Sequence, residues 1–179
     1  MREEQQLKFT FREANVADAL AVAEVHVQSW RESFAGIVPQ TFLDKMSVEN
    51  RTKAFETGFA LDSYKMFVAE TEANGIVGFA DFGKTRDNQN KFEAELYAIY
   101  LLRDFQRMGI GGKLFDLGAK YLVANNMNSL SLTALEVSPY KQFYEKMGGH
   151  LVERKTTQIE SESYATVVYG WNKLDASLR

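Results

Sequence analysis

Three glycines lie within four residues where an apolar segment of the chain gives way to an amphipathic one. The apolar segment, Tyr97–Leu102, is typical of a buried strand, and the residues after Gly109 have helical spacing. Backbone N–H groups at a helix N-terminus have no partner within the helix, and glycine leaves them uncovered by side chains. Because Arg103 and Arg107 add positive charge nearby, the turn from Arg107 to Gly112 predicts a binding site for a diphosphate.

Two familiar phosphate-binding motifs are excluded by single residues of this turn. The Walker loop requires a glycine where Arg107 stands and a hydroxyl residue where Leu114 stands. The dinucleotide fingerprint begins correctly with Gly109 and Gly111, but Leu114 replaces its third glycine. The sequence therefore does not predict a magnesium-bound nucleotide, a nicotinamide or a flavin.

Composition narrows the class of protein. The 179 residues are 45% hydrophobic and carry a net charge of -3, which predicts a single domain, residues 1–179 with a core of about 7–173, and gives no general reason to bind nucleic acid. The chain has no cysteine, and His26 and His150 lack the spacing of a ligand pair, so we expect no metal site. No apolar run reaches the roughly 18 residues of a membrane span, so we expect a cytoplasmic protein without a membrane partner.

Alternating and helical patterns divide the chain into short elements. Asn74–Gly75 between two apolar runs is typical of a β-hairpin, and Gly58 and Gly148–Gly149 are expected to end helices. Strands are expected at Leu7–Phe11, Met66–Ala69, Ile76–Ala80, Ala94–Leu102, Ser129–Leu135, Leu151–Val152 and Tyr164–Trp171, and helices at Asn15–Phe34, Val48–Thr57, Gly109–Asn125 and Pro139–Met147. This order predicts a mixed α/β sheet.

The pattern Gln106-x-x-Gly109-x-Gly111 resembles the acyl-CoA-binding signature of the GNAT superfamily of N-acyltransferases, Gln/Arg-x-x-Gly-x-Gly/Ala. On these positions alone, an ordinary glycine-rich turn between a strand and a helix explains the pattern equally well. Further segments, in the order and spacing of the family, favour the resemblance.

Three such segments are present. Phe143–Gly149 is similar to the family motif Phe-Tyr-Glu-Lys-x-Gly-Phe/Gly. Glu95 lies eleven positions before Gln106, as in acetyltransferases that use a glutamate base there. Val27–Pro39 resembles the Ser-Trp-Arg-x-x-Tyr-x-Gly-Ile-x-Pro opening of a bacterial small-molecule subgroup. Many relatives have proline where Arg103 stands, so the match is not complete.

The resemblance covers most of the chain and implies the GNAT fold, a mixed, mostly antiparallel sheet of about seven strands flanked by about four helices. It implies acetyl-CoA as cosubstrate and transfer of the acetyl group, by direct attack, to a primary amine of a small molecule. A polyamine, an amino acid or an aminoglycoside is the expected acceptor, and a homodimer is a further expectation from the family.

The expected chemistry needs a base, because an amine attacks a thioester only in its neutral form and a lysine-like amine has a pKa of about 10.4 in water. The resemblance implies Glu95 as the base, acting directly or through water, with Glu93 on the same face as the alternative. A solvated carboxylate without a catalytic part is the competing interpretation of Glu95.

The attacked carbonyl and the departing thiolate also need partners. Backbone N–H groups at Ile99–Leu101 are expected to stabilise the oxygen. The resemblance implies that Tyr144 donates a proton to the thiolate, whereas the competing interpretation makes it a core aromatic. The expected cofactor-binding residues are Ile99, Tyr100, Leu101, Gln106, Arg107, Met108, Gly109, Ile110, Gly111, Gly112, Lys113, Ser138 and Tyr144. Ser138 is equally well explained as a helix N-cap.

Two other functions remain open from the sequence. A protein or peptide N-acetyltransferase would need an open groove between the loop after the first helix, Phe34–Phe42, and the last strands. A CoA-binding sensor without catalysis would keep the glycine turn, with Glu95 and Tyr144 serving only structure. The acceptor loops are expected to include Phe34, Phe42, Asp81, Arg86 and Tyr169.

Overall fold

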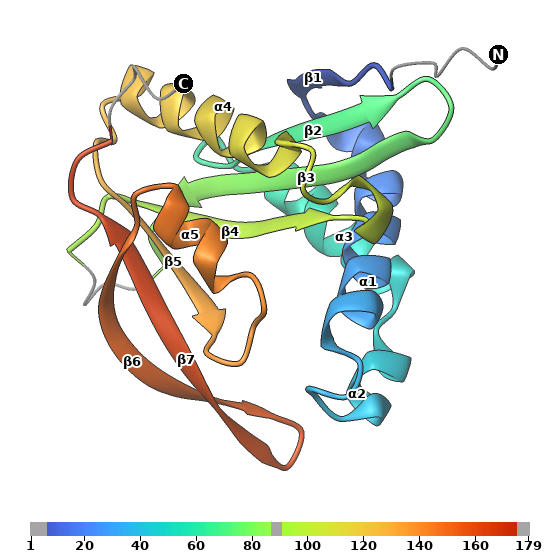
Figure 1. Ribbon diagram of the computed structural model, residues 1–179. Coiled ribbons are helices and arrows are strands. Elements are labelled where there is room, and N and C mark those ends of the chain that lie inside the picture. Colours follow the sequence, from blue (N-terminus) through green and yellow to red (C-terminus); the bar gives the residue numbers. More distant parts are fainter. Residues whose placement is uncertain (1–6, 87–90, 175–179) are drawn as a thin grey trace, which may run out of the picture.

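The computed structural model describes residues 7–86 and 91–174, which form one seven-stranded sheet with helices on both faces (Figure 1). The strands are β1 (Thr10–Glu13), β2 (Lys65–Thr71), β3 (Gly75–Lys84), β4 (Ala94–Leu101), β5 (Leu130–Leu135), β6 (His150–Ile159) and β7 (Glu162–Trp171). The helices are α1 (Ala19–Phe34), α2 (Gln40–Lys45), α3 (Val48–Phe59), α4 (Ile110–Ala124) and α5 (Lys141–Lys146), with 3-10 turns η1 (Val16–Asp18) and η2 (Arg103–Phe105).

The strands lie in the order β1-β2-β3-β4-β5-β7-β6, and only the β4–β5 pair is parallel. The predicted mixed, mostly antiparallel sheet is therefore confirmed. The described residues contain five α-helices where about four were expected, because α2 has only six residues and follows Pro39 too closely for its own pattern to be recognised. In the same part of the chain, no helix is long and apolar enough to cross a membrane.

Other differences concern the ends of elements. Helix α3 continues past Gly58 and ends at Phe59, with Ala60 as its C-cap. The prediction that Gly58 caps this helix was therefore wrong. The expected first helical turn after Asn15 is the separate turn η1, which Asn15 caps by accepting a hydrogen bond from the Ala17 N–H. Strand β6 has 10 residues, His150–Ile159, where only Leu151–Val152 were predicted. Its pairing with β7, and not its own apolar content, determines its length.

Each face of the sheet carries its own core. Helix α4 packs on one face through Leu114, Phe115 and Leu122, all fully buried, as its apolar stripe predicts. The approach is close at Gly118, where a Cβ atom would lie 2.1 Å from the Phe82 ring. On the other face, α1 and α3 cover a second cluster that includes Phe79 of β3. Figure 1 shows α4 and α5 together on one side and α1 and α3 on the other.

The centre of the sheet is split. Strands β4 and β5 pair only at Ala94–Leu130 and Glu95–Ser131 and then diverge, as Figure 1 shows. On its other edge β4 pairs with β3, but Asp81 faces Ala98 and Phe82 faces Leu96, which leaves Tyr97 as an extra residue. Such a bulge bends a strand and increases its twist. The bend carries the second half of β4 away from β5.

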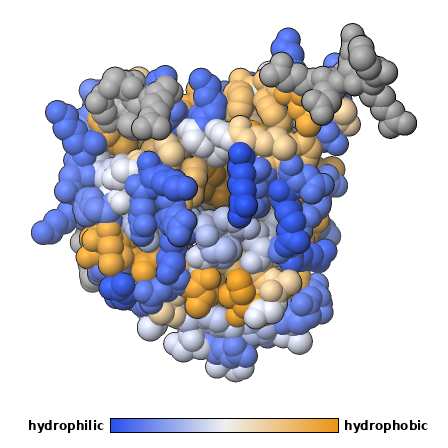
Figure 2. Space-filling model, viewed as in Figure 1, coloured by the Kyte–Doolittle hydropathy of each residue, from blue (hydrophilic) through white to orange (hydrophobic). Residues whose placement is uncertain are grey.

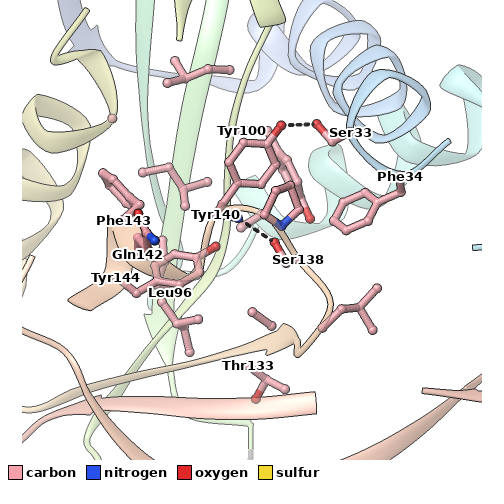
Figure 3. A pocket seen from close by; sticks show the side chains of 18 of the residues that line it. Ser33, Phe34, Leu96, Tyr100, Thr133, Ser138, Tyr140, Gln142, Phe143 and Tyr144 are labelled. Atoms are coloured by element: carbon pink, nitrogen blue, oxygen red, sulfur yellow. Dashed lines mark hydrogen bonds between the residues drawn. The ribbon is translucent and has the colours of Figure 1, made fainter. Parts of the chain in front are cut away.

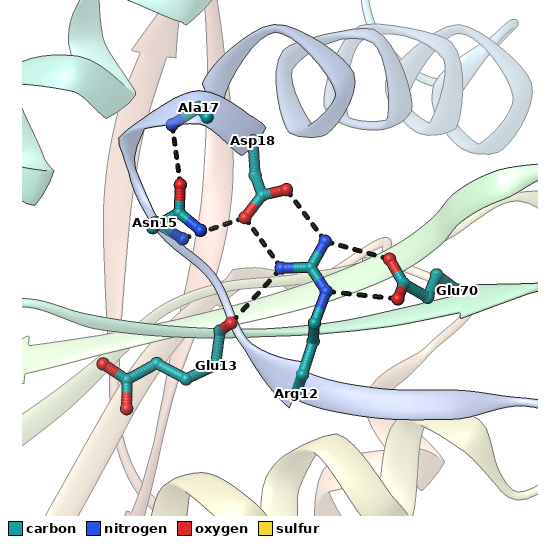
Figure 4. A network of polar contacts seen from close by, with 6 residues as sticks. All are labelled: Arg12, Glu13, Asn15, Ala17, Asp18 and Glu70. Atoms are coloured by element: carbon teal, nitrogen blue, oxygen red, sulfur yellow. Dashed lines mark hydrogen bonds and ion pairs between the residues drawn. The ribbon is translucent and has the colours of Figure 1, made fainter.

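A network around Arg12 holds the first strand to the rest of the fold (Figure 4). The Arg12 guanidinium donates two hydrogen bonds to Asp18, of 2.8 and 2.9 Å, and two to Glu70, of 3.1 and 2.9 Å. Asp18 also accepts the Asn15 N–H at 2.9 Å. The hydrogen bonds from Arg12 hold the pKa of Asp18 below its usual value. One side chain therefore joins β1, η1 and β2.

We expect Arg12→Met to lower the free energy of unfolding at neutral pH by roughly 1–2 kcal/mol, a value discounted because the Arg12 side chain is 35% exposed. Because the pKa of Asp18 is depressed in the folded state, its contribution is present above the unfolded pKa of about 3.9 and is lost as the pH falls through the folded pKa. Urea titrations at pH 7 and pH 3 measure the difference in free energy of unfolding between wild type and Arg12→Met. We expect this difference to be smaller at pH 3.

Lys53→Met is the matched control. Lys53 forms an ion pair with Glu49 on the surface of α3, where the two side chains are 66% and 76% exposed, so its loss should cost less than about 0.5 kcal/mol. Equal losses in the two variants would contradict a structural role for the Arg12 network.

Candidate active site

One large cavity, of about 1260 Å³, lies where β4 and β5 diverge. Figure 2 shows this face hollowed near its middle, with hydrophobic surface at the bottom of the hollow and hydrophilic side chains around it. The walls come from α1 (Trp30, Ser33, Phe34), β4 (residues 96–101), the glycine turn (Gln106, Arg107, Gly109, Gly111, Gly112), β5 (residues 132–135), the α5 region (Ser138, Pro139, Tyr140, Gln142, Phe143, Tyr144, Lys146) and the β6–β7 hairpin (Lys155, Thr156, Thr157, Thr166). The cavity thus joins both faces of the sheet.

The glycine turn forms the end of the cavity next to α4. Gly109 is the N-cap of α4 with φ of 80°, a left-handed conformation that favours glycine, and Arg107 is also left-handed, with φ of 63°. No side chain caps α4, and its first turn has no acidic residue. The uncapped N–H groups and the helix dipole therefore favour an anion, and the Arg107 side chain adds positive charge.

Most cofactor-binding residues predicted from the sequence lie together in this cavity. They are Ile99, Tyr100, Leu101, Gln106, Arg107, Gly109, Gly111, Gly112, Ser138 and Tyr144. Met108, Ile110 and Lys113 are not part of the lining. The Ile110 side chain is buried in the core, and that of Met108 is exposed, so these two residues offer only their backbone to the turn.

The signature glutamine has a structural contact that the sequence does not reveal. The Gln106 side chain donates to the Leu101 carbonyl oxygen at 3.2 Å and to the Tyr140 hydroxyl at 3.4 Å. The Tyr140 hydroxyl also bonds Ser33 of α1, at 2.7 Å. Gln106 therefore fixes the turn to the end of β4 and to the segment before α5.

Ser138 and Tyr144 line the cavity from the α5 side (Figure 3). Ser138 is buried, and its Oγ accepts the Tyr140 N–H at 3.3 Å, while the N-cap of α5 is Tyr140. The Tyr144 hydroxyl has no hydrogen-bond partner among the described residues, and its ring lies 5.6 Å from that of Tyr169. Burial raises the pKa of Tyr144 to about 12, so its hydroxyl is protonated at neutral pH.

Neither Glu95 of β4 nor Glu93, which lies just before β4, lines the cavity. The Glu95 carboxylate is held by Arg86, whose guanidinium donates at 2.5 and 3.1 Å and whose N–H donates at 3.0 Å. Arg86 also lies over the ring of Tyr97, 4.3 Å from its centroid. Glu93 accepts the N–H groups of Asn128 and Ser129 at the start of β5. Any role of Glu95 in proton transfer therefore requires a bridging water.

Two other buried titratable groups lie outside the cavity lining. Burial raises the pKa of Asp81 to about 7; its Oδ2 accepts the Tyr64 hydroxyl at 2.8 Å, and its Oδ1 has no partner. Burial lowers the pKa of His26 to about 3, since its ring is packed against Trp30, Phe55, Phe79 and Tyr100. His26 is therefore a neutral core residue.

The end of the cavity beyond β4 and β5 is built from segments that sequence reasoning did not connect. Trp30 and Phe34 form one wall, with ring centroids 4.5 Å apart. Lys155, Thr157 and Thr166 come from the β6–β7 hairpin. Of the loop residues named from the sequence, Phe34 lines the cavity, whereas Phe42, Asp81, Arg86 and Tyr169 do not. The period-two pattern of residues 164–171 was the only sequence signal for this wall. That pattern predicts a strand but does not show which strand pairs with it.

Comparison with known proteins assigns the chain to a family. A family model described as an acetyltransferase (GNAT) domain matches residues 62–148. YuaI of Bacillus subtilis, an uncharacterised N-acetyltransferase, is 35% identical over 168 residues, which cover 93% of this chain and 95% of that protein. The chain belongs to the GNAT superfamily of N-acetyltransferases. This GNAT protein is therefore an enzyme of the acyltransferase class.

Solved GNAT structures share the fold. PaiA N-acetyltransferase from Thermoplasma acidophilum, crystallised with coenzyme A, aligns with a TM-score of 0.69 at 15% identity and covers 90% of this chain and 98% of its own. YncA from Salmonella typhimurium, with acetyl-CoA as its cofactor, aligns with a TM-score of 0.71 at 17% identity, over 94% and 95% of the two chains. The predicted family and fold are thus confirmed.

The residues of the glycine turn fit the diphosphate of coenzyme A. An uncapped helix N-terminus, an adjacent arginine and no acidic side chain in the first helical turn form an environment that favours a multiply charged anion. For a metal ion the finding is different. Residues 7–86 and 91–174 include no cluster of three or more His, Cys, Asp or Glu side chains placed to bind one.

We expect Gly112→Glu to weaken CoA binding by about 30-fold or more, because a carboxylate at roughly 5 Å repels the diphosphate by roughly 2–3 kcal/mol. A Cβ atom at Gly112 meets only the Met147 sulfur, at 3.8 Å, and glutamate in the first turn of a helix is favourable. The fold should therefore keep its stability. Calorimetric titration with CoA and thermal unfolding measure the two quantities.

Lys120→Gln is the control, because it makes the chain more negative by the same one charge at an exposed site near the other end of α4. CoA affinity should be unchanged in this variant. An unchanged affinity in Gly112→Glu, with the fold intact, would place the diphosphate elsewhere.

Proposed function

We propose that this GNAT enzyme transfers an acetyl group from acetyl-CoA to a primary amine of a small molecule by direct attack. The observation that carries the proposal is one cavity of about 1260 Å³, whose lining includes the glycine turn, the diverging strands β4 and β5, and Trp30, Ser33 and Phe34 of α1. The thioester and the amine can therefore meet without an intermediate carrier. The absence of cysteine excludes a thiol nucleophile in the protein.

The glycine turn is proposed to bind the diphosphate through the N–H groups from Arg107 to Gly112, with the Arg107 and Lys113 side chains adding charge. Acetyl-CoA would supply an activated acyl group and a thiolate leaving group with a pKa of about 8.5. CoA and acetyl-CoA in the structures of PaiA and YncA support this assignment.

Strand β4 supplies the proposed stabilisation of the acetyl oxygen. Its residues beyond Glu95 have no partner in β5, yet residues 96–101 line the cavity. Their backbone N–H groups on that edge are available to a ligand, and we place the oxyanion partner at Ile99–Leu101. Fixed backbone donors stabilise developing negative charge without reorganisation.

Tyr144 is the proposed proton donor to the thiolate. Its hydroxyl is protonated, lines the cavity and has no partner in the described part of the protein. A pKa of about 12 lies well above that of the thiol, so full transfer of the proton is uphill. Tyr144 therefore acts mainly by hydrogen bonding to the thiolate as it leaves, which is the stage at which its negative charge develops.

Glu95 is the proposed base through a water molecule. Its carboxylate is fixed by Arg86 beside the bulge at Tyr97, and Tyr97 lines the cavity. A water near the bulge would carry the proton from the amine towards Glu95. Burial raises the pKa of three tyrosines of the cavity lining, Tyr97, Tyr100 and Tyr144, so these three do not fit this role.

Contacts at the far end of the cavity favour a small acceptor over a peptide. Glu160, at the tip of the β6–β7 hairpin, accepts hydrogen bonds from Thr41 and Lys45 of α2. Phe34 and Leu43 pack with Leu135 and Ile159 beneath this contact. These contacts bridge the loop after α1 and the last strands, between which a peptide would need an open groove.

We expect Tyr144→Phe to lower kcat by roughly 100-fold while CoA affinity stays within about threefold, because the hydroxyl acts on the leaving thiolate and not on binding. Thiol release from acetyl-CoA, followed with a chromogenic reagent across a panel of amines, measures kcat. The control is Tyr169→Phe, since the Tyr169 hydroxyl donates to Glu145 outside the cavity. An unchanged kcat in Tyr144→Phe would show that Tyr144 contributes only to packing. Binding of CoA without turnover on any amine would indicate a CoA sensor.

We expect Glu95→Gln to lower kcat by roughly 100-fold and to remove the acidic limb of the pH–rate profile, because the amide keeps acceptors for Arg86 but takes up no proton. Glu93→Gln should change neither quantity, since the Glu93 carboxylate accepts the N–H groups of Asn128 and Ser129, just before β5, and does not line the cavity. An identical pH profile in wild type and Glu95→Gln would indicate that the amine loses its proton to solvent and not to Glu95.

A further inference from the structure

We propose that the acceptor is an amine that also carries a carboxylate, and that Lys155 is the residue that selects it. The inference rests on the proposed function and narrows its substrate class. It comes from the charges of the cavity lining and from the arrangement of side chains on the wall opposite α1.

The charged side chains that line the cavity are all cationic in the part of the chain that the structure describes. Among the described residues the lining includes the cations Arg107, Lys146 and Lys155 and no aspartate or glutamate. The nearby carboxylates already have cationic partners: Glu95 pairs with Arg86 and Glu136 with Arg154, while Glu153 pairs with Lys155 itself. An acceptor with several positive charges would therefore lose water without gaining an opposite charge.

Lys155 is the cation at the acceptor end. Arg107 belongs to the glycine turn and Lys146 to α5, so both lie with the elements assigned to the cofactor. Lys155 instead lies directly opposite Thr166 of β7, which in turn lies opposite Leu135 of β5. Directly opposed residues share one face of a sheet.

Threonines share this face of the sheet with Lys155. Thr157 lies two residues further along β6 and Thr133 two residues before Leu135 on β5, so both share the face with Thr166. All of them line the cavity, and Figure 3 shows Thr133 below the cavity, on the side away from α1. An ammonium group with neighbouring hydroxyl donors is the environment that a carboxylate prefers.

The ion pair between Lys155 and Glu153 is exchangeable. The Lys155 Nζ lies 2.9 Å from the Glu153 carboxylate, and the two side chains are 41% and 48% exposed. Exposed pairs of this kind contribute little, because water competes for both charges. A substrate carboxylate enclosed between this wall and the aromatic wall of Trp30 and Phe34 would be less hydrated and would compete well for Lys155.

The proposal therefore favours an amino-acid-like acceptor over the polyamine and aminoglycoside classes. A single ammonium group would become neutral before attack, and a single carboxylate would remain to be paired. Polyamines and aminoglycosides would keep further positive charges that the lining does not complement.

The test compares acceptors that differ only in the carboxylate. Wild-type enzyme is assayed by thiol release with γ-aminobutyrate against butylamine, L-phenylalanine against 2-phenylethylamine, and spermidine and kanamycin as polycations. We expect at least one carboxylate member to exceed its partner by tenfold or more in kcat/KM. Lys155→Met should remove at least tenfold from that member and change its partner by less than threefold, and Lys155→Glu should shift the preference towards spermidine.

Lys53→Met and Lys53→Glu are the matched controls, because Lys53 also forms an exposed ion pair with a glutamate, on α3. Both should leave the preference unchanged. The proposal is overturned if a polycation is the best acceptor, or if Lys155→Met lowers both members of a pair equally.

Calorimetric binding of the same pairs in the presence of CoA separates this inference from the proposed function. Binding of a carboxylate member that Lys155→Met abolishes supports the selection by Lys155, even without turnover. Absence of turnover on every amine would overturn the transferase proposal alone. Equal binding of both members of every pair to wild type would overturn the role of Lys155.

Discussion

The limited pairing of β4 with β5 is the constraint on which the site depends. Two residue pairs hold the strands together at one end, and the extra residue Tyr97 bends β4 away from β5 beyond them. The backbone edge that is left unpaired would be costly in a dry core. Here it lines a cavity, where water and ligands have access to its polar groups. The same divergence joins the two faces of the sheet, so one opening serves both the cofactor end and the acceptor end.

The bend is held from the side of the sheet that carries α1 and α3. Arg86 lies over the Tyr97 ring and pairs with Glu95, and the Tyr97 hydroxyl donates to the Lys84 carbonyl oxygen at 2.6 Å. Tyr64 stacks on the same ring and donates to the buried Asp81. These contacts within the chain fix the bulge, which indicates that the gap between the strands belongs to the fold itself.

The sequence predicts well what is local and poorly what depends on distant partners. The turn from Gln106 to Gly112 and its position between a strand and a helix follow from residues within one short segment. Glu95 shows the limit. Its place on β4 was predicted, but its pairing with Arg86 arises from side chains at the ends of two strands and leaves no pattern in either strand. The wall that contains Lys155 depends on the register of β6 on β7 and of β7 on β5, which no single segment determines.

The contact between α2 and the β6–β7 hairpin lies apart from the glycine turn. The coenzyme end is built from one continuous stretch of chain and from its backbone groups. The hairpin tip is joined to a six-residue helix, α2, where Thr41 and Lys45 both donate to Glu160. Exchange of that short helix or of the hairpin tip would alter this contact without changing the strand order of the sheet. Substitutions at this contact should therefore leave the coenzyme end intact.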